Sequence, residues 1–309
     1  MYSLRQIVVQ LPENCFKQDG MLRANLHSSL QRTHFYRAQE VFKMMGLMDE
    51  NPEELEIELV REIMNSLKDK VELKVITWDS QMETNEQRVL VNYLLQGDKG
   101  YTITEMFSAL RTAELEFISM VNWWQWNLME LFKEKELENL PVFLAMSLPE
   151  TTVEERLHLY ELLHPVHRLL DFWCGHPNQG QSFVPVAEWT LSDWQEAQVH
   201  LQPQLRTPEL KEQLMRCIAQ LKPFEISQQL RFTDGTVSVD NTVAACLLPL
   251  WEESQSMRSL VQRWQKLRPV HPVTLEPTTE GEALDLLRQA LTGLERLSYV
   301  LLERRTGMP

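Results

Sequence analysis

Glycine is scarce in this chain, with 10 residues among 309, about half of its usual share in globular proteins. Because glycine adopts positive φ angles without steric cost, few positions suit tight turns or glycine-rich loops. The sequence contains neither GxGxxG nor GxxxxGK[ST], and it also lacks the GxSxG, HExxH and EF-hand signatures. These absences argue against the common nucleotide-binding loops and against the common hydrolase and calcium-binding motifs.

The cysteines are few and far apart, and they form no CxxC pair: Cys15, Cys174, Cys217 and Cys246. The apolar run at the N-terminus is too short for a signal peptide. No stretch approaches 18 consecutive apolar residues, so no membrane span is predicted. We therefore expect reduced thiols in a cytoplasmic protein, with the nucleus as the alternative compartment.

Basic residues are also in deficit, with 30 lysines and arginines against 44 acidic residues, a net charge of -14 and a pI of about 5.1. A nucleic-acid-binding protein needs a positive field to displace counterions from the phosphates. The charge of this chain has the opposite sign, which disfavours a nucleic-acid partner. An acidic, solvated surface that keeps the protein soluble explains it.

Apolar residues recur with helical spacing through most of the chain. Threonine and asparagine caps mark several helix starts, among them Thr152 with Glu155, Thr207 before Pro208, and Thr279 with Glu282. Gly46 is well placed to end the first helix. The predicted helices span residues 21–45, 51–67, 84–96, 102–136, 151–175, 190–201, 207–221, 241–253, 255–267 and 279–305.

A few segments favour strands instead, at residues 3–11 and 71–75 and in a β-hairpin near 228–240, where Asp234-Gly235 suits a two-residue turn. The predicted fold class is therefore mainly α, an irregular assembly of helices with a few short strands and one hairpin. The Gly/Pro/Asn-rich stretch 175–185 is the best loop. It divides an N-terminal helical subdomain, 1–175, from a C-terminal helical subdomain, 176–309, that carries the hairpin.

Three of the nine tryptophans, Trp123, Trp124 and Trp126, fall within four residues of the predicted helix 102–136. Successive residues on a helix are about 100° apart, so one stripe cannot hold all three. Trp124 aligns with apolar neighbours and is assigned to the core, whereas Trp126 aligns with polar ones. Since tryptophan and methionine recur at binding surfaces, we predict that Trp123, Trp126 and Met129 contact a protein partner. The alternative is that these side chains belong to the core.

His164, His167, Cys174 and His176 are the only cluster of soft metal ligands in the sequence. Zinc requires about four such groups in tetrahedral geometry, which makes these four the candidate metal site. Their spacing fits usual zinc motifs poorly. The alternative is that the histidines decorate a helix end and that Cys174 is a buried, inert thiol. No other cofactor is predicted.

The segments Glu114–Phe132 and His158–His176 resemble the helical C-terminal region of mysterin, the giant AAA+ RING-type ubiquitin ligase. The AAA+ phosphate loop and the RING cysteine pattern are absent from this sequence. The resemblance implies a part of a ubiquitin ligase that is not catalytic, and no catalytic residue carries over.

The sequence thus contains no recognisable catalytic motif, and we expect no catalysis by this chain on its own. The predicted function is a non-catalytic protein–protein interaction or scaffold module within a larger intracellular protein. The alternative is an accessory region of a ubiquitin ligase or another enzyme, carrying the His/Cys metal site.

Overall fold

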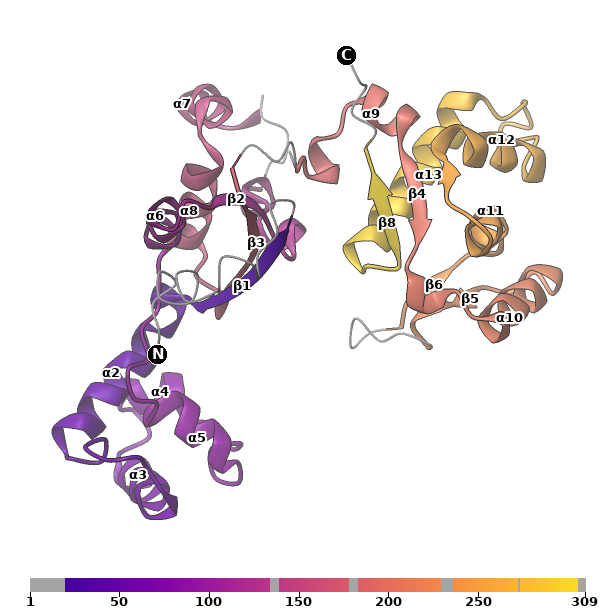
Figure 1. Cartoon of the computed structure of the whole chain (residues 1–309). Helices are drawn as coiled ribbons and strands as arrows, with labels where there is room; N and C mark the ends of the chain where they lie inside the picture. Colours follow the sequence, from indigo (N-terminus) through magenta and orange to yellow (C-terminus); the bar gives the residue numbers. More distant parts are fainter. Residues whose placement is uncertain (1–19, 134–138, 178–182, 229–235, 272, 305–309) are drawn as a thin grey trace. The chain divides into compact units, whose positions relative to one another are not determined.

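The computed structural model describes residues 20–133, 139–177, 183–228, 236–271 and 273–304. Helices account for 55% of these residues, and the strands form small antiparallel sheets, which confirms the mainly α prediction. The chain forms two compact units, residues 1–183 and 184–309 (Figure 1). The sequence prediction sets its boundary after residue 175. Within the described residues, no helix combines the length and apolarity needed to cross a bilayer.

The first unit combines helices with one three-stranded sheet. Its strands are β1 (Met21–His27), β2 (Glu116–Met120) and β3 (Leu169–Gly175). Its α-helices are α2 (Ser29–Met44), α3 (Glu54–Ser66), α4 (Glu72–Thr77), α5 (Glu86–Tyr93), α6 (Ile103–Thr112), α7 (Val142–Ser147) and α8 (Val153–Leu163), and its 3-10 helices include η1 (Trp123–Trp126), η2 (Leu128–Leu131) and η4 (Leu148–Glu150).

The sheet of the first unit has the strand order β1-β3-β2 and is antiparallel throughout. The register pairs Leu26 with Leu170 and Phe117 with Cys174. Alternate residues of the central strand, Leu170, Phe172 and Cys174, are fully buried, as expected for a strand with one face on the core.

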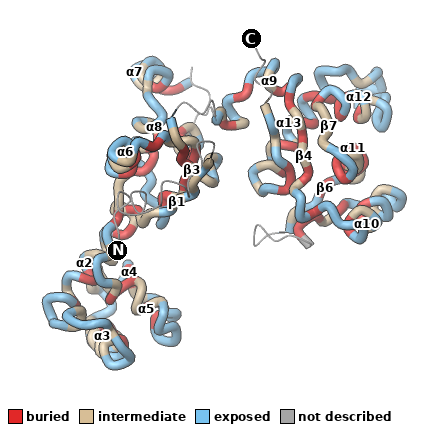
Figure 2. Tube along the Cα trace, viewed as in Figure 1, coloured by how far each residue is buried: buried red, intermediate tan, exposed pale blue. Residues whose placement is uncertain are grey.

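Two separate hydrophobic cores lie within this unit (Figure 2). The first packs α6 and α8 against β2 and β3, through residues such as Met106, Leu110 and Leu157. The second joins α2, α3 and α5, through residues such as Phe42 and Val60.

The second unit has its own sheet and core. Its strands are β4 (Gln198–Leu201), β5 (Phe224–Glu225), β6 (Ser238–Val239), β7 (Gln255–Ser256) and β8 (Val300–Glu303). Its α-helices are α9 (Leu191–Glu196), α10 (Pro208–Ala219), α11 (Asn241–Leu247), α12 (Met257–Leu267) and α13 (Glu280–Arg296), with 3-10 turns η5 (Val186–Glu188), η6 (Pro203–Leu205), η7 (Ile226–Gln228) and η8 (Leu248–Trp251).

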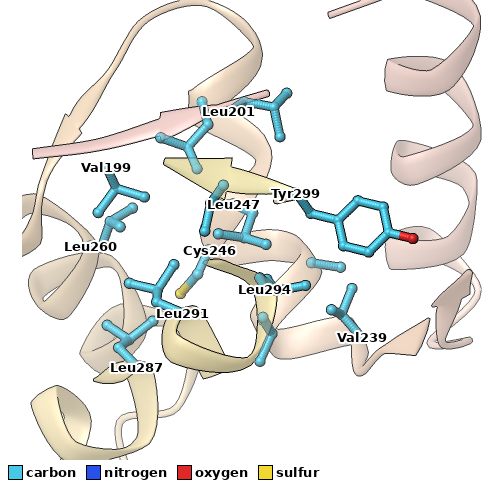
Figure 3. Close-up of a cluster of buried hydrophobic side chains, with 14 of the residues drawn as sticks. Val199, Leu201, Val239, Cys246, Leu247, Leu260, Leu287, Leu291, Leu294 and Tyr299 are labelled. Atoms are coloured by element: carbon cyan, nitrogen blue, oxygen red, sulfur yellow. The ribbon is translucent and has the colours of Figure 1, made fainter. Parts of the chain in front are cut away.

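Strands β7-β4-β8 form an antiparallel sheet in the second unit, and α11, α12 and α13 pack around its core. Figure 3 shows Val199 and Leu201 of β4 beside Cys246 of α11 and Leu287 and Leu291 of α13. The short strands β5 and β6 pair antiparallel. The predicted hairpin turn at Asp234-Gly235 lies outside the described residues.

The helix starts that rest on local chemistry are confirmed. Capping boxes form between Thr152 and Glu155 and between Thr279 and Glu282, and Thr207 caps α10 ahead of its first-turn proline. Gly46 follows the end of α2 with a φ of 79°. In each case a side chain or a glycine satisfies backbone groups that a helix end leaves free.

The long helix predicted over 102–136 is wrong. Its first part is α6, which ends at Thr112, and Glu114 then takes a φ of 54° and turns the chain into β2. The tryptophans that follow lie in 3-10 turns. A non-glycine residue in the left-handed region is an unfavourable helix stop, and therefore leaves no sequence signal.

Other errors have the same origin in long-range pairing. The helices predicted to begin at residue 21 and to continue to residue 175 contain β1 and β3, which pair with each other across the sheet. The helix predicted to continue to residue 305 ends at Arg296 and gives way to β8. The strand predicted over 71–75 is wrong for a different reason, because Glu72–Thr77 form the local helix α4 with Val71 as its N-cap. The strand predicted over 3–11 lies outside the described residues.

Leu221 occupies a left-handed position after a helix, where glycine is the usual residue. It allows a test of the idea that non-glycine residues end helices in this chain at a cost in stability. It follows α10 with a φ of 54°, and its side chain is 76% exposed. We expect Leu221→Gly to raise the free energy of unfolding by up to about 1 kcal/mol, because glycine removes the left-handed strain. Leu221→Ala keeps the strain and loses only exposed side-chain atoms. Equal stabilities of the two variants in urea denaturation would refute the expectation.

Candidate functional site

The tryptophan side chains of residues 123–126 point in directions other than those predicted from the sequence. Trp124 is 42% exposed, so its assignment to the core is wrong, whereas Trp126 is only 7% exposed. Trp123 and Met129 are half-buried against the first core. Because the segment is built from 3-10 turns after a strand, the directions expected of an α-helix do not apply.

The structure brings two predicted sites together in an aromatic stack. The His167 ring lies 4.3 Å from the Trp126 ring at 27°, and 5.5 Å from the Tyr160 ring at 24°. His167 Nε2 lies 3.1 Å from the carbonyl oxygen of Gln125. The side chain proposed as a metal ligand therefore packs with the one proposed as a partner contact, and both help to attach α8 to η1.

The four candidate metal ligands do not converge. His164 caps the end of α8, His167 lies in the aromatic stack, and Cys174 is buried in β3, where its thiol donates to the carbonyl of Leu22 at 3.6 Å. Burial raises the pKa of Cys174 to about 11, so the metal-binding thiolate is disfavoured. Among the described residues no group of three or more His, Cys, Asp or Glu side chains is arranged to hold a metal ion.

The stacked histidine makes a pH-dependent contribution to stability. Burial lowers the pKa of His167 below its usual value, the hydrogen bond to Gln125 opposes this, and nearby His164 adds to the lowering. The folded protein therefore binds the proton more weakly than the unfolded chain. This contribution is fully present above about pH 6.5 and falls as the pH drops through the range between that value and the lowered pKa.

The variant His167→Phe retains an aromatic ring in the stack and removes the proton. Urea denaturation between pH 7.5 and pH 5 should show a smaller loss of stability on acidification for the variant than for the natural protein. A loss of the same size in both proteins would contradict the assignment to His167.

Several of the exposed apolar side chains of this unit lie on α7 and α8. Phe143 of α7 is 84% exposed, and Leu162 and Leu163 of α8 are 55% and 60% exposed. The opposite face of α8 is buried through Leu157 and Tyr160.

Asp98 is the centre of a buried polar cluster in the first unit, and no sequence motif marks it. Arg32, Tyr36 and Gln39 lie on one face of α2, at i, i+4 and i+7. His27 ends β1, and Asp98 lies in the connection between α5 and α6. Arg32 and Asp98 are 66 residues apart in the chain, so no local pattern could have paired them.

The Asp98 carboxylate is fully enclosed by donors. Its Oδ2 accepts from Arg32 Nη2 at 2.7 Å, and its Oδ1 lies 2.8 Å from His27 Nδ1. The side chains of Arg32 and Asp98 are both 0% exposed, and that of His27 is 15% exposed. Burial favours the neutral acid, but the hydrogen bonds from His27 and Arg32 outweigh it and hold the pKa of Asp98 below its usual value.

The hydrogen bonds to Asp98 fix the orientation of both Arg32 and His27. Arg32 also donates to the side-chain oxygen of Asn92 at 3.1 Å, which sets the plane of the guanidinium. His27 turns its Nδ1 toward Asp98, and its side chain is largely buried. Ser28, beside it, caps α2 through its hydroxyl. The cluster thus orients one imidazole and binds several segments together.

No protein-family model matches the sequence, and no curated protein matches it either. Solved structures do match. PKMT2 from Rickettsia typhi superposes with a TM-score of 0.51 at 12% identity, over 98% of this chain and 55% of that one. PKMT2 in complex with AdoHcy gives the same TM-score at 13% identity, over 97% of this chain and 55% of that one.

The chain therefore spans about half the length of the structures that it matches, and at this identity the likeness establishes a shared fold. The matched structures are of PKMT2, one of them in complex with AdoHcy, and this likeness contradicts the predicted function of a scaffold without catalysis and the ubiquitin-ligase role. The resemblance of the sequence to mysterin is not tested by it.

Proposed function

We propose that this chain works in protein lysine methylation, as the part of a methyltransferase that holds the protein substrate. The observation that carries the proposal is the match with PKMT2 over nearly the whole chain, across both of its units. The part of PKMT2 that this chain does not cover, about half of that protein, leaves room for the methyl donor elsewhere in the enzyme.

The described sheets support a substrate-binding role for this chain, with the methyl donor bound elsewhere in the enzyme. They are antiparallel and contain two or three strands. Nucleotide-like cofactors commonly bind at the carboxyl ends of parallel strands, next to a glycine-rich turn. The described residues build no such crevice, so we assign the AdoMet site to the uncovered part of the enzyme.

The charge of the chain supports a lysine-bearing substrate. Residues 1–183 contain 28 acidic and 17 basic side chains, a net charge of -11 out of the total of -14. A negative field of this kind attracts a cationic substrate and speeds its encounter with the surface. The lysine ammonium is compact and strongly hydrated, so charge complementarity favours its approach without requiring a deep pocket.

Binding of degenerate peptide libraries tests the proposal on the purified chain. Three libraries share random flanks around a fixed central lysine, arginine or acetyl-lysine. We expect the lysine library to be retained about tenfold better than the acetyl-lysine library, a difference of about 1.4 kcal/mol. Retention should weaken as the ionic strength rises.

The arginine library separates substrate recognition from general attraction to an acidic surface. A site for a lysine substrate should discriminate against the planar guanidinium, whereas an acidic field binds both cations alike. Equal retention of the lysine and arginine libraries, or of the lysine and acetyl-lysine libraries, would contradict the proposal.

A further inference from the structure

The first unit consists of two lobes that share no buried core. The helical lobe, residues 29–97, contains the core of α2, α3 and α5. The sheet lobe, residues 21–28 and 101–175, contains the core of α6, α8 and the β-sheet. The chain passes between them twice, at 27–29 on the way into α2 and at 98–102 on the way out to α6. The orientation of the lobes is therefore set largely at these two crossings.

The two crossings run side by side and bond to each other through the backbone. The amide of Tyr101 donates to the carbonyl of His27 at 2.7 Å, and the amide of Ser29 donates to the carbonyl of Tyr101 at 3.0 Å. The amide of Ser28 donates to the carbonyl of Arg168 at 2.9 Å. These three bonds join the first crossing to the second and to the start of β3.

Side chains of the Asp98 cluster also join the two lobes at these crossings. The carboxylate bonds to Arg32 and Gln39 of the helical lobe with one oxygen and to His27 of the sheet lobe with the other. Gly100 lies so close that a Cβ there would meet the Ser29 Cα at 2.5 Å and the Tyr36 hydroxyl at 2.7 Å. Of these side-chain bonds to the carboxylate, only the one from His27 crosses between the lobes.

We propose that the His27–Asp98 bond is the latch of a hinge, whose opening lets the helical lobe move against the sheet lobe while both hydrophobic cores stay intact. A buried polar contact is held only in one geometry, so it favours one orientation of the lobes. A hinge needs few residues to absorb the change in backbone angles, and the crossings provide two short segments. Arg32 and Gln39 keep the carboxylate bonded to α2 when the latch opens.

Amide hydrogen exchange followed by NMR on the full chain distinguishes a hinge from unfolding. In His27→Ala, the amides of Ser28, Ser29 and Tyr101 should exchange at least about tenfold faster, because opening exposes the crossing bonds. The amides in the middle of α2, at Ala38 and Phe42, and those of β3 that pair with β1 should exchange at the natural rate.

Asp98→Asn is the second variant and should also accelerate exchange at the crossings. Because it leaves the buried Arg32 guanidinium without its carboxylate, it should accelerate exchange in α2 as well. Arg23→Ala is the control, because it removes the exposed pair between Arg23 and Asp171 within the sheet lobe and leaves the latch in place. In His27→Ala, which leaves the Arg32–Asp98 pair intact, equal acceleration across α2 and the crossings would show unfolding of the helical lobe and overturn the hinge. Unchanged exchange at the crossings in His27→Ala would overturn it as well.

Discussion

Trp126→Ala is expected to destabilise the protein by about 3–5 kcal/mol, the usual cost of removing a buried tryptophan. Trp126 is 7% exposed, and its ring contacts both Tyr160 and His167, at 5.4 and 4.3 Å between centroids. Its removal leaves a cavity between η1 and α8 and deprives His167 of its stacking partner. Urea denaturation at pH 7.5 measures the loss.

Trp124→Ala is the matched control, since it removes the same side chain two residues away. Trp124 is 42% exposed, and its replacement should change the stability by no more than about 0.5 kcal/mol. A larger loss for Trp124→Ala than for Trp126→Ala would show that the segment faces the other way.

Gly100→Ala is the second replacement for which we expect a large loss, about 1–3 kcal/mol. The added Cβ would lie 2.5 Å from the Cα and 2.6 Å from the backbone nitrogen of Ser29. Neither backbone atom can move without disturbing the start of α2, so the methyl group overpacks the site.

Gly293→Ala, in the last turn of α13, makes the same chemical change where no atom outside the local helix backbone lies within 4 Å of the new Cβ. It should raise the free energy of unfolding by up to about 1 kcal/mol, because alanine favours a helix interior. Thermal unfolding of the two variants should therefore shift in opposite directions. A Gly100→Ala protein as stable as the natural one would contradict the close packing of the crossing segments.

Local chemistry was enough to predict several helix ends. The capping boxes at Thr152 and Thr279 and the threonine–proline start at Thr207 each satisfy backbone groups within a few residues. The mainly α class follows from many such signals. These predictions held because the interactions responsible for them are local in the chain.

The strands were missed because their stabilisation is not local. β1 pairs with β3 across nearly 150 residues, and neither has a turn signal that links it to its partner. Glu114 and Ser298 end helices at positive φ where a glycine would have been recognisable. The chain's shortage of glycine thus concealed the breaks that separate α6 from β2 and α13 from β8.

The candidate site was the least predictable part. The local sequence predicts a helix at Arg32 and a turn at Asp98. Only the folded chain brings Arg32 Nη2 within 2.7 Å of Asp98 Oδ2. The prediction for the tryptophans failed for a related reason: their directions were derived from an α-helix, and the segment forms 3-10 turns after a strand. The predicted scaffold function is contradicted by the likeness to PKMT2, and no sequence motif signals that likeness, because it is one of fold at 12–13% identity.

The central claim is that this chain acts in protein lysine methylation. The direct test purifies the tagged chain with its native assembly from the cells that make it, and incubates it with AdoMet carrying a radioactive methyl group. We predict that label enters proteins, that hydrolysis recovers it as methyl-lysine, and that AdoHcy inhibits the transfer. Label no higher than that of a tag-only control, or label recovered only on other residues, would contradict the account.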